Sequence, residues 1–412
     1  MLRCIRLAAC ALFLFPLGAA AFEAVDVLTP STNGRYPAYP AEGLPLRNYW
    51  VQLGAMYDDN LLRRPSGDNA DTVVRLGAGA RGEYPVIGRQ RFYYEARADG
   101  YKYNQFEDID NISWGALGEW RYEVGNDLSG VIGASIRQFQ AALTEIQRDQ
   151  RDEITEKRVV GTAGYRVGPH LRLRGGVEYL SFDRPALAQN NIDNLIGLLG
   201  ADWVTDLGNT IGVEAHEARG EAPVNQLVDP LGIFVNNDYR QRDVAVAGTW
   251  VSSPFVRFAG RYGHTERTYT VLPGRDYSGP TWLAALDFLP GNKTILTLET
   301  SRHITSLIEV GASHAVVTGW SFGPSWAASA KLNFIARLFQ QKLDYEGDPA
   351  AALGVTPVRS ETLKGVRVGT YWEYNRQIHW QFAVDHGTRS SNFEDRDFKY
   401  NALMGNVRYV FW

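Results

Sequence analysis

The chain alternates polar and apolar residues with a period of two along most of its length. In the stretch RFYYEARADGY, residues 91–101, Phe92, Tyr94 and Ala96 share one face and the charged side chains share the other. This period is typical of a β-strand with one wet and one apolar face. The alternation predicts strands over these approximate spans: 47–57, 71–84, 90–103, 111–124, 127–142, 154–167, 170–183, 190–204, 209–220, 238–251, 254–267, 278–289, 292–303, 312–325, 330–345, 361–374, 377–388 and 396–412.

The connections between these segments alternate between short and long. Short ones include GND at 125–127, GPH at 168–170 and NRQ at 375–377, and long polar loops such as TEIQRDQRDE lie between them. Outer-membrane barrels alternate in this way, because their periplasmic turns are short and their external loops are long. We therefore predict an all-β fold, a transmembrane antiparallel up-and-down β-barrel of about 18 strands over residues 47–412. An even strand number leaves both chain ends in the periplasm of a Gram-negative bacterium.

A soluble all-β fold, such as a propeller or a set of sandwiches, is the alternative architecture. It would have to bury the second face of each strand, which carries Arg, Glu, Asp and His. Such residues are seldom fully buried without partners. A water-filled lumen removes this difficulty, and barrels of about 16–18 strands are wide enough to hold one.

The first residues predict a secretory signal peptide. The opening MLRCIR is basic, an apolar run follows, and the small residues Ala19 and Ala21 precede the expected cleavage point. A lipoprotein-like LAAC also occurs, but it comes too early, because no apolar run precedes it. We divide the chain into a signal peptide at 1–21, an extended N-terminal periplasmic segment at 22–46 and the barrel. Both cysteines lie in the signal peptide, so no disulfide stabilises the barrel.

Charge and hydropathy exclude other classes of protein. The formal net charge is −4 and the pI is about 6.0, so no basic field favours a nucleic-acid partner. After the N-terminus no run of about 18 apolar residues occurs, which excludes a transmembrane helix. The 7 histidines show no metal-ligand spacing, so we expect neither a metal nor another cofactor.

Two short motifs match enzyme signatures by letter only. GAGARG, with Gly77, Gly79 and Gly82, fits a dinucleotide motif, but a strand and a hairpin follow instead of the required helix. GWSFG places Ser321 as in a nucleophile elbow, which needs a strand–turn–helix context. We therefore predict a non-enzymatic protein without catalytic residues. An outer-membrane hydrolase is kept as a second alternative function.

Charged and aromatic residues gather on the face predicted to line the lumen. Paired charges and aromatic rings there would bind sugars or an anionic polymer, or would form a salt-bridged wall that only stiffens the barrel. The candidate residues of this lumen or substrate path are Arg91, Tyr93, Glu95, Arg97, Asp99, Arg172, Arg174, Glu178, Arg257, Arg261, Arg367 and Glu373. Aromatic residues near segment ends on the apolar face suit two interfacial girdles. These are Trp50, Tyr94, Trp114, Trp120, Tyr122, Trp203, Trp250, Trp320 and Trp372.

Two stretches resemble a known family. The first strand ends in YDDNLLR, within residues 49–64, and GPSWAASAKLNFIARL lies at 323–338. With the chain length and the aromatic C-terminus, they resemble the EpsL-type exopolysaccharide-associated outer-membrane β-barrel family, linked to PEP-CTERM/exosortase polysaccharide biosynthesis. The resemblance implies a role in exopolysaccharide biosynthesis or export, with exopolysaccharide and polysaccharide export proteins as partners. The alternative is a general or substrate-specific porin outside any polysaccharide pathway.

The chain ends in NVRYVFW, which has an apolar outer face and an aromatic terminus. Tyr409, Phe411 and Trp412 resemble the signal read by the outer-membrane assembly machinery. That machinery and outer-membrane lipid, including lipopolysaccharide, are expected partners. Because the outward frame ends at Phe411, we expect Tyr409 and Phe411 to carry the signal.

Deleting residues 409–412 should abolish membrane assembly, because the truncation removes both outward aromatic residues and shortens the closing strand. The amount of protein in the outer-membrane fraction measures this effect. Normal insertion of the truncated protein would contradict the proposed role of the terminus.

Overall fold

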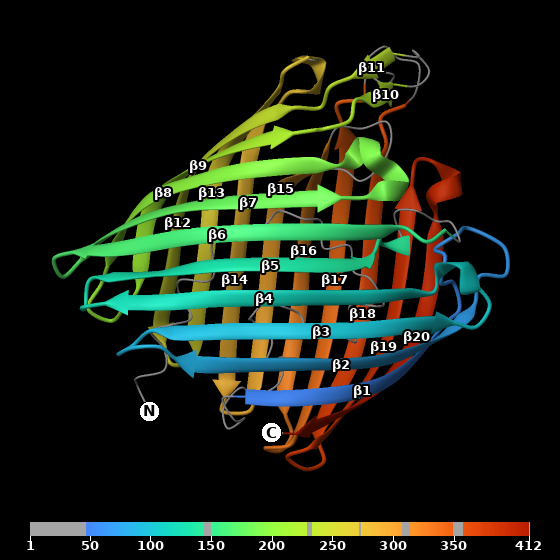
Figure 1. Cartoon of the computed structure of the whole chain (residues 1–412), viewed down its shortest axis with the longest axis horizontal. Coiled ribbons are helices and arrows are strands. Elements are labelled where there is room, and N and C mark those ends of the chain that lie inside the picture. The colour runs from blue at the N-terminus through green and yellow to red at the C-terminus, as the bar shows by residue number, and fades with distance from the viewer. Residues whose placement is uncertain are drawn as a thin grey trace.

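The computed structural model describes residues 47–143, 150–228, 233–271, 273–306, 314–348 and 357–411. These residues form one antiparallel sheet of 18 strands that closes into a barrel (Figure 1). The predicted fold class is therefore confirmed. The expected signal peptide at 1–21, the segment at 22–46 and Trp412 lie outside the described residues, so those assignments stay predictions.

Every barrel strand begins and ends within 3 residues of the span that the alternation predicts. The strands are β1 (Arg47–Asp58), β2 (Asp71–Pro85), β3 (Arg91–Tyr103), β4 (Asn111–Val124), β5 (Leu128–Gln140), β6 (Glu153–Val167), β7 (Leu171–Asp183), β8 (Ile192–Val204), β9 (Thr210–Glu221), β12 (Tyr239–Ser253), β13 (Val256–Tyr269), β14 (Tyr277–Gly291), β15 (Thr294–Ser306), β16 (His314–Ala327), β17 (Leu332–Glu346), β18 (Ser360–Glu373), β19 (Ile378–Ser391) and β20 (Phe398–Phe411).

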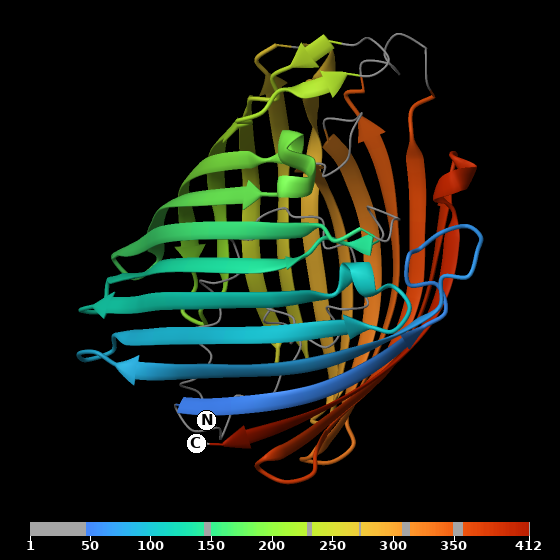
Figure 2. The same cartoon turned by 45° about the vertical axis from the view of Figure 1, so that its right-hand side comes forward.

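Long connections gather at one end of the barrel and short turns at the other (Figures 1 and 2). The long connection after β9 holds a small hairpin of β10 (Gln226–Val228) and β11 (Ile233–Val235), which the alternation does not predict. Other connections at this end contain short 3₁₀ turns. These are η3 (Glu107–Ile109), η4 (Pro185–Asn190), η5 (Pro273–Arg275) and η6 (Glu394–Arg396).

The first and last strands close the barrel. β1 pairs with β20 from Tyr49 opposite Phe411 to Asp58 opposite Ala402, and it also pairs with β2 on its other side. Each barrel strand thus has two hydrogen-bonded neighbours, and no sheet edge is left open. In lipid this closure satisfies the backbone groups, because no water is present there to accept or donate hydrogen bonds.

Side chains alternate strictly between the outer and the inner face. In β1 the outward Val51 and Leu53 are 44% and 52% exposed, whereas the inward Gln52 between them is only 3% exposed. The last strand follows the same rule, with Tyr409 and Phe411 outward and Arg408 inward. The outer wall is therefore an apolar band, and the polar residues line the interior.

The aromatic girdle prediction is wrong for Trp50. Its side chain is 5% exposed and lies inside the barrel, with the Arg408 guanidinium carbon 5.1 Å from its ring centroid. Trp50 shares the inward frame of Gln52, and its outward neighbours are Tyr49 and Val51. The predicted tryptophans that do face outward are Trp114, Trp120, Trp203, Trp250, Trp320 and Trp372.

The GAGARG motif lies within β2, where glycine makes room for large neighbouring side chains. A Cβ atom on Gly79 would overlap the Trp50 ring, and one on Gly82 would overlap the Tyr94 ring. A Cβ atom on Gly77 would run into the Asp99 carboxylate. The motif therefore serves packing in the barrel wall, as the sequence context predicts.

A Gly79→Val substitution should destabilise the barrel by about 1–3 kcal/mol, because it overpacks the Trp50 ring. Unfolding in urea, followed by tryptophan fluorescence, measures the loss. Adding Trp50→Ala should recover most of it, because the ring is then gone. Gly161→Val is the matched control, since a Cβ atom at Gly161 meets nothing within 4 Å. Equal losses at positions 79 and 161 would contradict this account.

Candidate functional site

The predicted lumen residues all lie on the inner wall. They come from the inward faces of β3, β7, β13 and β18, and their strand neighbours on either side point outward. This placement fits either of the two roles that the sequence leaves open, a path for solutes or a salt-bridged wall. The contacts of each residue decide which role it can serve.

A chain of ion pairs joins three of these arginines across neighbouring strands. Arg172 and Arg174 of β7 both bind Asp202 of β8, with nitrogen–oxygen distances of 2.6 and 2.7 Å. Arg174 also reaches Glu214 of β9 at 3.2 Å, and Arg261 of β13 lies 2.7 Å from the same carboxylate. This series of ion pairs links the neighbouring strands of the barrel wall from β7 to β13.

The chain ends at Asp243 of β12, which pairs with Arg261 and accepts a hydrogen bond from Thr265. The three carboxylates of this network are absent from the predicted set, although each sits at an inward position of its strand. Their side chains are nearly buried, at 4% for Asp202, 1% for Glu214 and 8% for Asp243. The alternation places these three carboxylates on the inward face. Predicting that they pair with arginines also requires the register between neighbouring strands.

A second network surrounds Asp99 of β3. Its carboxylate lies 2.8 Å from Arg75 Nη2 and accepts a hydrogen bond of 2.6 Å from Gln52 Nε2. Gln52 Oε1 in turn accepts hydrogen bonds from Arg408, next to Trp50. Because Arg75 and Asp99 are 1% and 3% exposed, this group packs the wall and offers no free charge.

Other predicted residues also have local partners. Arg367 of β18 lies 2.6 Å from Asp385 Oδ2, which also accepts a hydrogen bond from Tyr400 Oη. The remaining pairs are Arg158 with Glu178 at 2.8 Å, Tyr93 Oη with Glu95 at 2.7 Å, and Arg91 with Glu83 at 3.4 Å. Glu373 stands opposite His379 in the register of β18 and β19. Much of the inner wall is therefore salt-bridged.

Three inward arginines have no such partner. Arg97 of β3, Arg166 of β6 and Arg257 of β13 form no ion pair with any carboxylate in the described ranges. Arg166 and Arg257 are exposed and Arg97 is half-buried, although all three point into the barrel. Arg166 and Arg257 lie near the short-turn end of their strands, where the lumen opens, whereas Arg97 lies in the middle of β3. These guanidinium groups can therefore meet a solute inside the lumen.

The loop after β1 narrows the mouth of the barrel on one side. Leu61 and Leu62 are 2% and 0% exposed and pack against inward residues of β1, β2, β3 and β20. Arg63 has a positive φ of 56° and makes a two-bond pair with Asp58. Its guanidinium carbon also lies 3.5 Å from the Tyr400 ring centroid. These contacts fix an unfavourable backbone conformation and hold the loop at the mouth.

An aromatic and basic cluster lies at the same end of β12 and β13. The Arg267 guanidinium carbon is 4.1 Å from the Tyr239 ring centroid, and Arg267 donates hydrogen bonds to Gln241. The Tyr269 ring stacks on His314 with centroids 6.3 Å apart. These side chains are buried, as Arg63 and Tyr400 are on the other side, so they pack the wall at the mouth and hold it rigid.

Neither enzyme motif forms a catalytic arrangement. Ser321 lies inside β16, where its hydroxyl donates to Glu299 Oε2 at 3.3 Å and accepts from Arg337 at 3.2 Å. Among the described residues, no group of three or more His, Cys, Asp or Glu is placed to hold a metal ion. No helix in the same ranges is long and apolar enough to cross a membrane.

Comparison with known proteins finds similarity at the level of the fold. No protein-family model and no curated protein sequence matches the chain. Solved structures do match, among them Pseudomonas aeruginosa OccK2 (OpdF) in complex with glucuronate, at 11% identity and a TM-score of 0.50. Pseudomonas aeruginosa OpdK with vanillate matches at 10% identity and a TM-score of 0.50. Each covers 89% of this chain, and the chain covers 98% and 99% of theirs.

These matches support the outer-membrane fold. The chain is an outer-membrane β-barrel of a Gram-negative bacterium, as predicted. The expectation that it is not an enzyme stays a prediction. The resemblance to the EpsL-type family is wrong, and so is the role in exopolysaccharide biosynthesis and export that it implied. The stretch YDDNLLR has a structural role at the mouth of the barrel. Asp58 pairs with Arg63, and Leu61 and Leu62 pack against the inner wall.

Arg261→Gln should lower the free energy of unfolding by about 1–3 kcal/mol, because it removes a charged partner from the nearly buried Glu214 and Asp243. Arg257→Gln on the same strand should change it by less than about 0.5 kcal/mol, because Arg257 has no ion pair to lose. Urea unfolding in liposomes measures both variants. Equal stability of the two would show that the network does not hold the wall.

Proposed function

We propose that the chain is a substrate-specific outer-membrane porin that admits small organic anions, carboxylates above all. The observation that carries this proposal is the set of unpaired arginines on the hollow inner wall, Arg97, Arg166 and Arg257. A guanidinium group binds a carboxylate through two parallel hydrogen bonds, so it both attracts and orients such a solute. Arg166 and Arg257 lie near the short-turn end of the barrel and Arg97 lies at mid-strand, so a carboxylate in the lumen meets guanidinium groups at two levels.

The narrowed mouth supports a selective rather than a general channel. The buried leucines of the first long loop and the Arg63–Asp58 pair hold one side, and the Arg267–Tyr239 contact holds the other. A mouth narrowed by rigidly packed side chains selects solutes by size and shape more strongly than a wide open pore does. A general porin would leave this mouth open.

The ligands in the matching structures have the same chemistry. OpdK is solved with vanillate and OccK2 (OpdF) with glucuronate, an aromatic and a sugar acid that each carry one carboxylate. At 10–11% identity these structures establish only a shared fold. They support the choice of carboxylates as the first solutes to test.

Purified protein in planar bilayers should form channels that favour anions, as measured by the reversal potential across a salt gradient. The triple variant Arg97→Gln, Arg166→Gln, Arg257→Gln should lower the anion-to-cation permeability ratio roughly two- to fivefold, because it removes the free charges from the lumen. Lys364→Gln is the matched control, because Lys364 points outward and is exposed.

Added vanillate or glucuronate should reduce the single-channel current of the native protein more than vanillin or glucose, which lack the carboxylate. The triple variant should lose most of this difference. A cation-selective channel, or equal block by charged and neutral solutes, would refute the proposed substrate class. Absence of any channel would refute the porin itself.

A further inference from the structure

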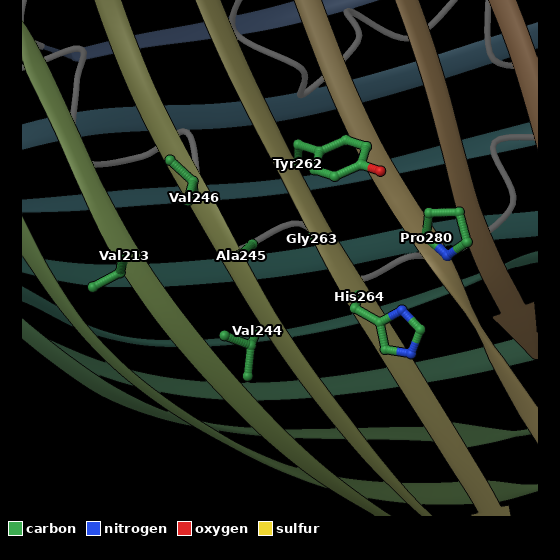
Figure 3. A pocket seen from close by; sticks show the side chains of 8 residues that line it. All are labelled: Val213, Val244, Ala245, Val246, Tyr262, Gly263, His264 and Pro280. Carbon is green, nitrogen blue, oxygen red and sulfur yellow. The ribbon is translucent and has the colours of Figure 1, made fainter.

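A groove lies on the outer wall of the barrel, across β9, β12, β13 and β14 (Figure 3). Its volume is about 350 Å³, and its floor is the backbone at Ala245 and Gly263, where no large side chain stands. The walls are outward apolar residues that are 51–64% exposed. These are Val213, Val244, Val246 and Tyr262.

Three arginines stand next to this groove on the same outward face. Arg242 precedes Val244 in β12 and is the next outward residue toward the long loops, about 7 Å away along the strand. Arg240 is the outward residue beyond it and stands opposite Arg219 of β9. The three side chains are 59%, 45% and 65% exposed.

Glu217 lies among these arginines and arranges them. Its carboxylate is 2.6 Å from Arg240, 3.4 Å from Arg219 and 3.8 Å from Arg242. Glu266 stands opposite Arg242 on β13. Glu221 is the next outward residue beyond Arg219 on β9. The three arginines therefore share the one carboxylate of Glu217, and Glu266 and Glu221 stand at the margins of the cluster.

The cluster lies at the level where the apolar band of the outer wall ends toward the long external loops. The lysines within the described barrel strands mark the same level, because all of them are exposed and outward on the loop-side half of their strands. They are Lys102, Lys157, Lys342, Lys364 and Lys399. In the outer membrane this end contacts the outer leaflet, whose lipid is lipopolysaccharide. Basic residues at a membrane surface attract anionic headgroups.

We propose that this surface is a binding site for the lipid A part of lipopolysaccharide. An acyl chain lies in the groove beside Val244 and Val246, and a phosphate group binds Arg219, Arg240 and Arg242. The planar guanidinium group can donate two parallel hydrogen bonds to phosphate oxygens. Several guanidinium groups around one phosphate therefore bind it more tightly than they bind an anion with a single charge. Apolar contact and charge thus act on the two ends of the same molecule.

A second apolar groove lies elsewhere on the outer wall, across β2, β3 and β4. It holds about 470 Å³ and is lined by the exposed Val74, Leu76 and Ile112, with Lys102 and Arg151 at its loop end. Its floor again includes a glycine of β3. Asp110 also lines this groove and lies 2.5 Å from Lys102, and Glu153 lies 2.5 Å from Arg151. Because both cations of the second groove are already paired, the groove beside Arg240 and Arg242 is the stronger candidate site.

The proposal depends on the outer-membrane location and not on what passes through the lumen. Purified protein in dodecyl maltoside micelles should bind bisphosphorylated lipid A, measured by native mass spectrometry and by the rise in unfolding temperature. The triple variant Arg219→Gln, Arg240→Gln, Arg242→Gln should bind about tenfold more weakly, because each cationic residue near an anionic lipid surface adds favourable energy. Val244→Trp should weaken binding as well, because the ring fills the groove.

Lys364→Gln is the matched control, since it removes an outward cation at the same level but away from the groove. Its affinity should stay within twofold of the native value, and the migration of the heat-stable form on gels checks that every variant is folded. Phosphatidylglycerol, which carries a single phosphodiester, should bind more weakly than lipid A. Equal affinity of the native protein and the triple variant, or binding of phosphatidylglycerol as tight as that of lipid A, would overturn the proposal. The variant Arg219→Gln, Arg240→Gln, Arg242→Gln should keep the channel selectivity of the native protein. A loss of lipid A binding is therefore distinguishable from a failure of the proposed porin function.

Discussion

The closure of the hydrogen-bond ladder between β1 and β20 is the constraint on which the rest of the structure depends. Without it two strands would present unpaired backbone groups to lipid, at a cost of several kcal/mol for each group. Closure also divides the side chains into two sets, because each strand alternates across a continuous wall. An outward apolar band and an inward polar wall follow from one geometric fact.

The inner wall then meets a second requirement, because charges taken partly from water need partners. The network from Arg172 through Glu214 to Asp243 meets it by sharing each carboxylate between arginines of neighbouring strands. Arginines outside such networks can bind a solute instead of a carboxylate of the wall. They are solvated by the lumen alone and can exchange that water for a solute.

Much of the fold could be predicted from the alternation, because a period of two is a local property that each strand carries by itself. The strand spans and the inward placement of Arg97 or Arg174 follow from it directly. The face of β1 on which Trp50 lies was predicted wrongly. An aromatic residue suits either face, and only the alternation of its neighbours shows which face it occupies. The pairing of Arg261 with Glu214 was also missed, because it depends on the register between β9, β12 and β13. Family resemblance failed for a related reason: short motifs at strand ends report local packing, which unrelated barrels share.

The separation of the two basic residue types has a chemical consequence. Each lysine of the described strands faces outward, so arginine supplies the cationic charge of the inner wall. A guanidinium group stays protonated at any pH that a bacterium survives, and reagents that acylate amines do not attack it. Amine-directed labelling of intact cells would therefore mark the rim of this barrel while the electrical character of its passage stayed the same.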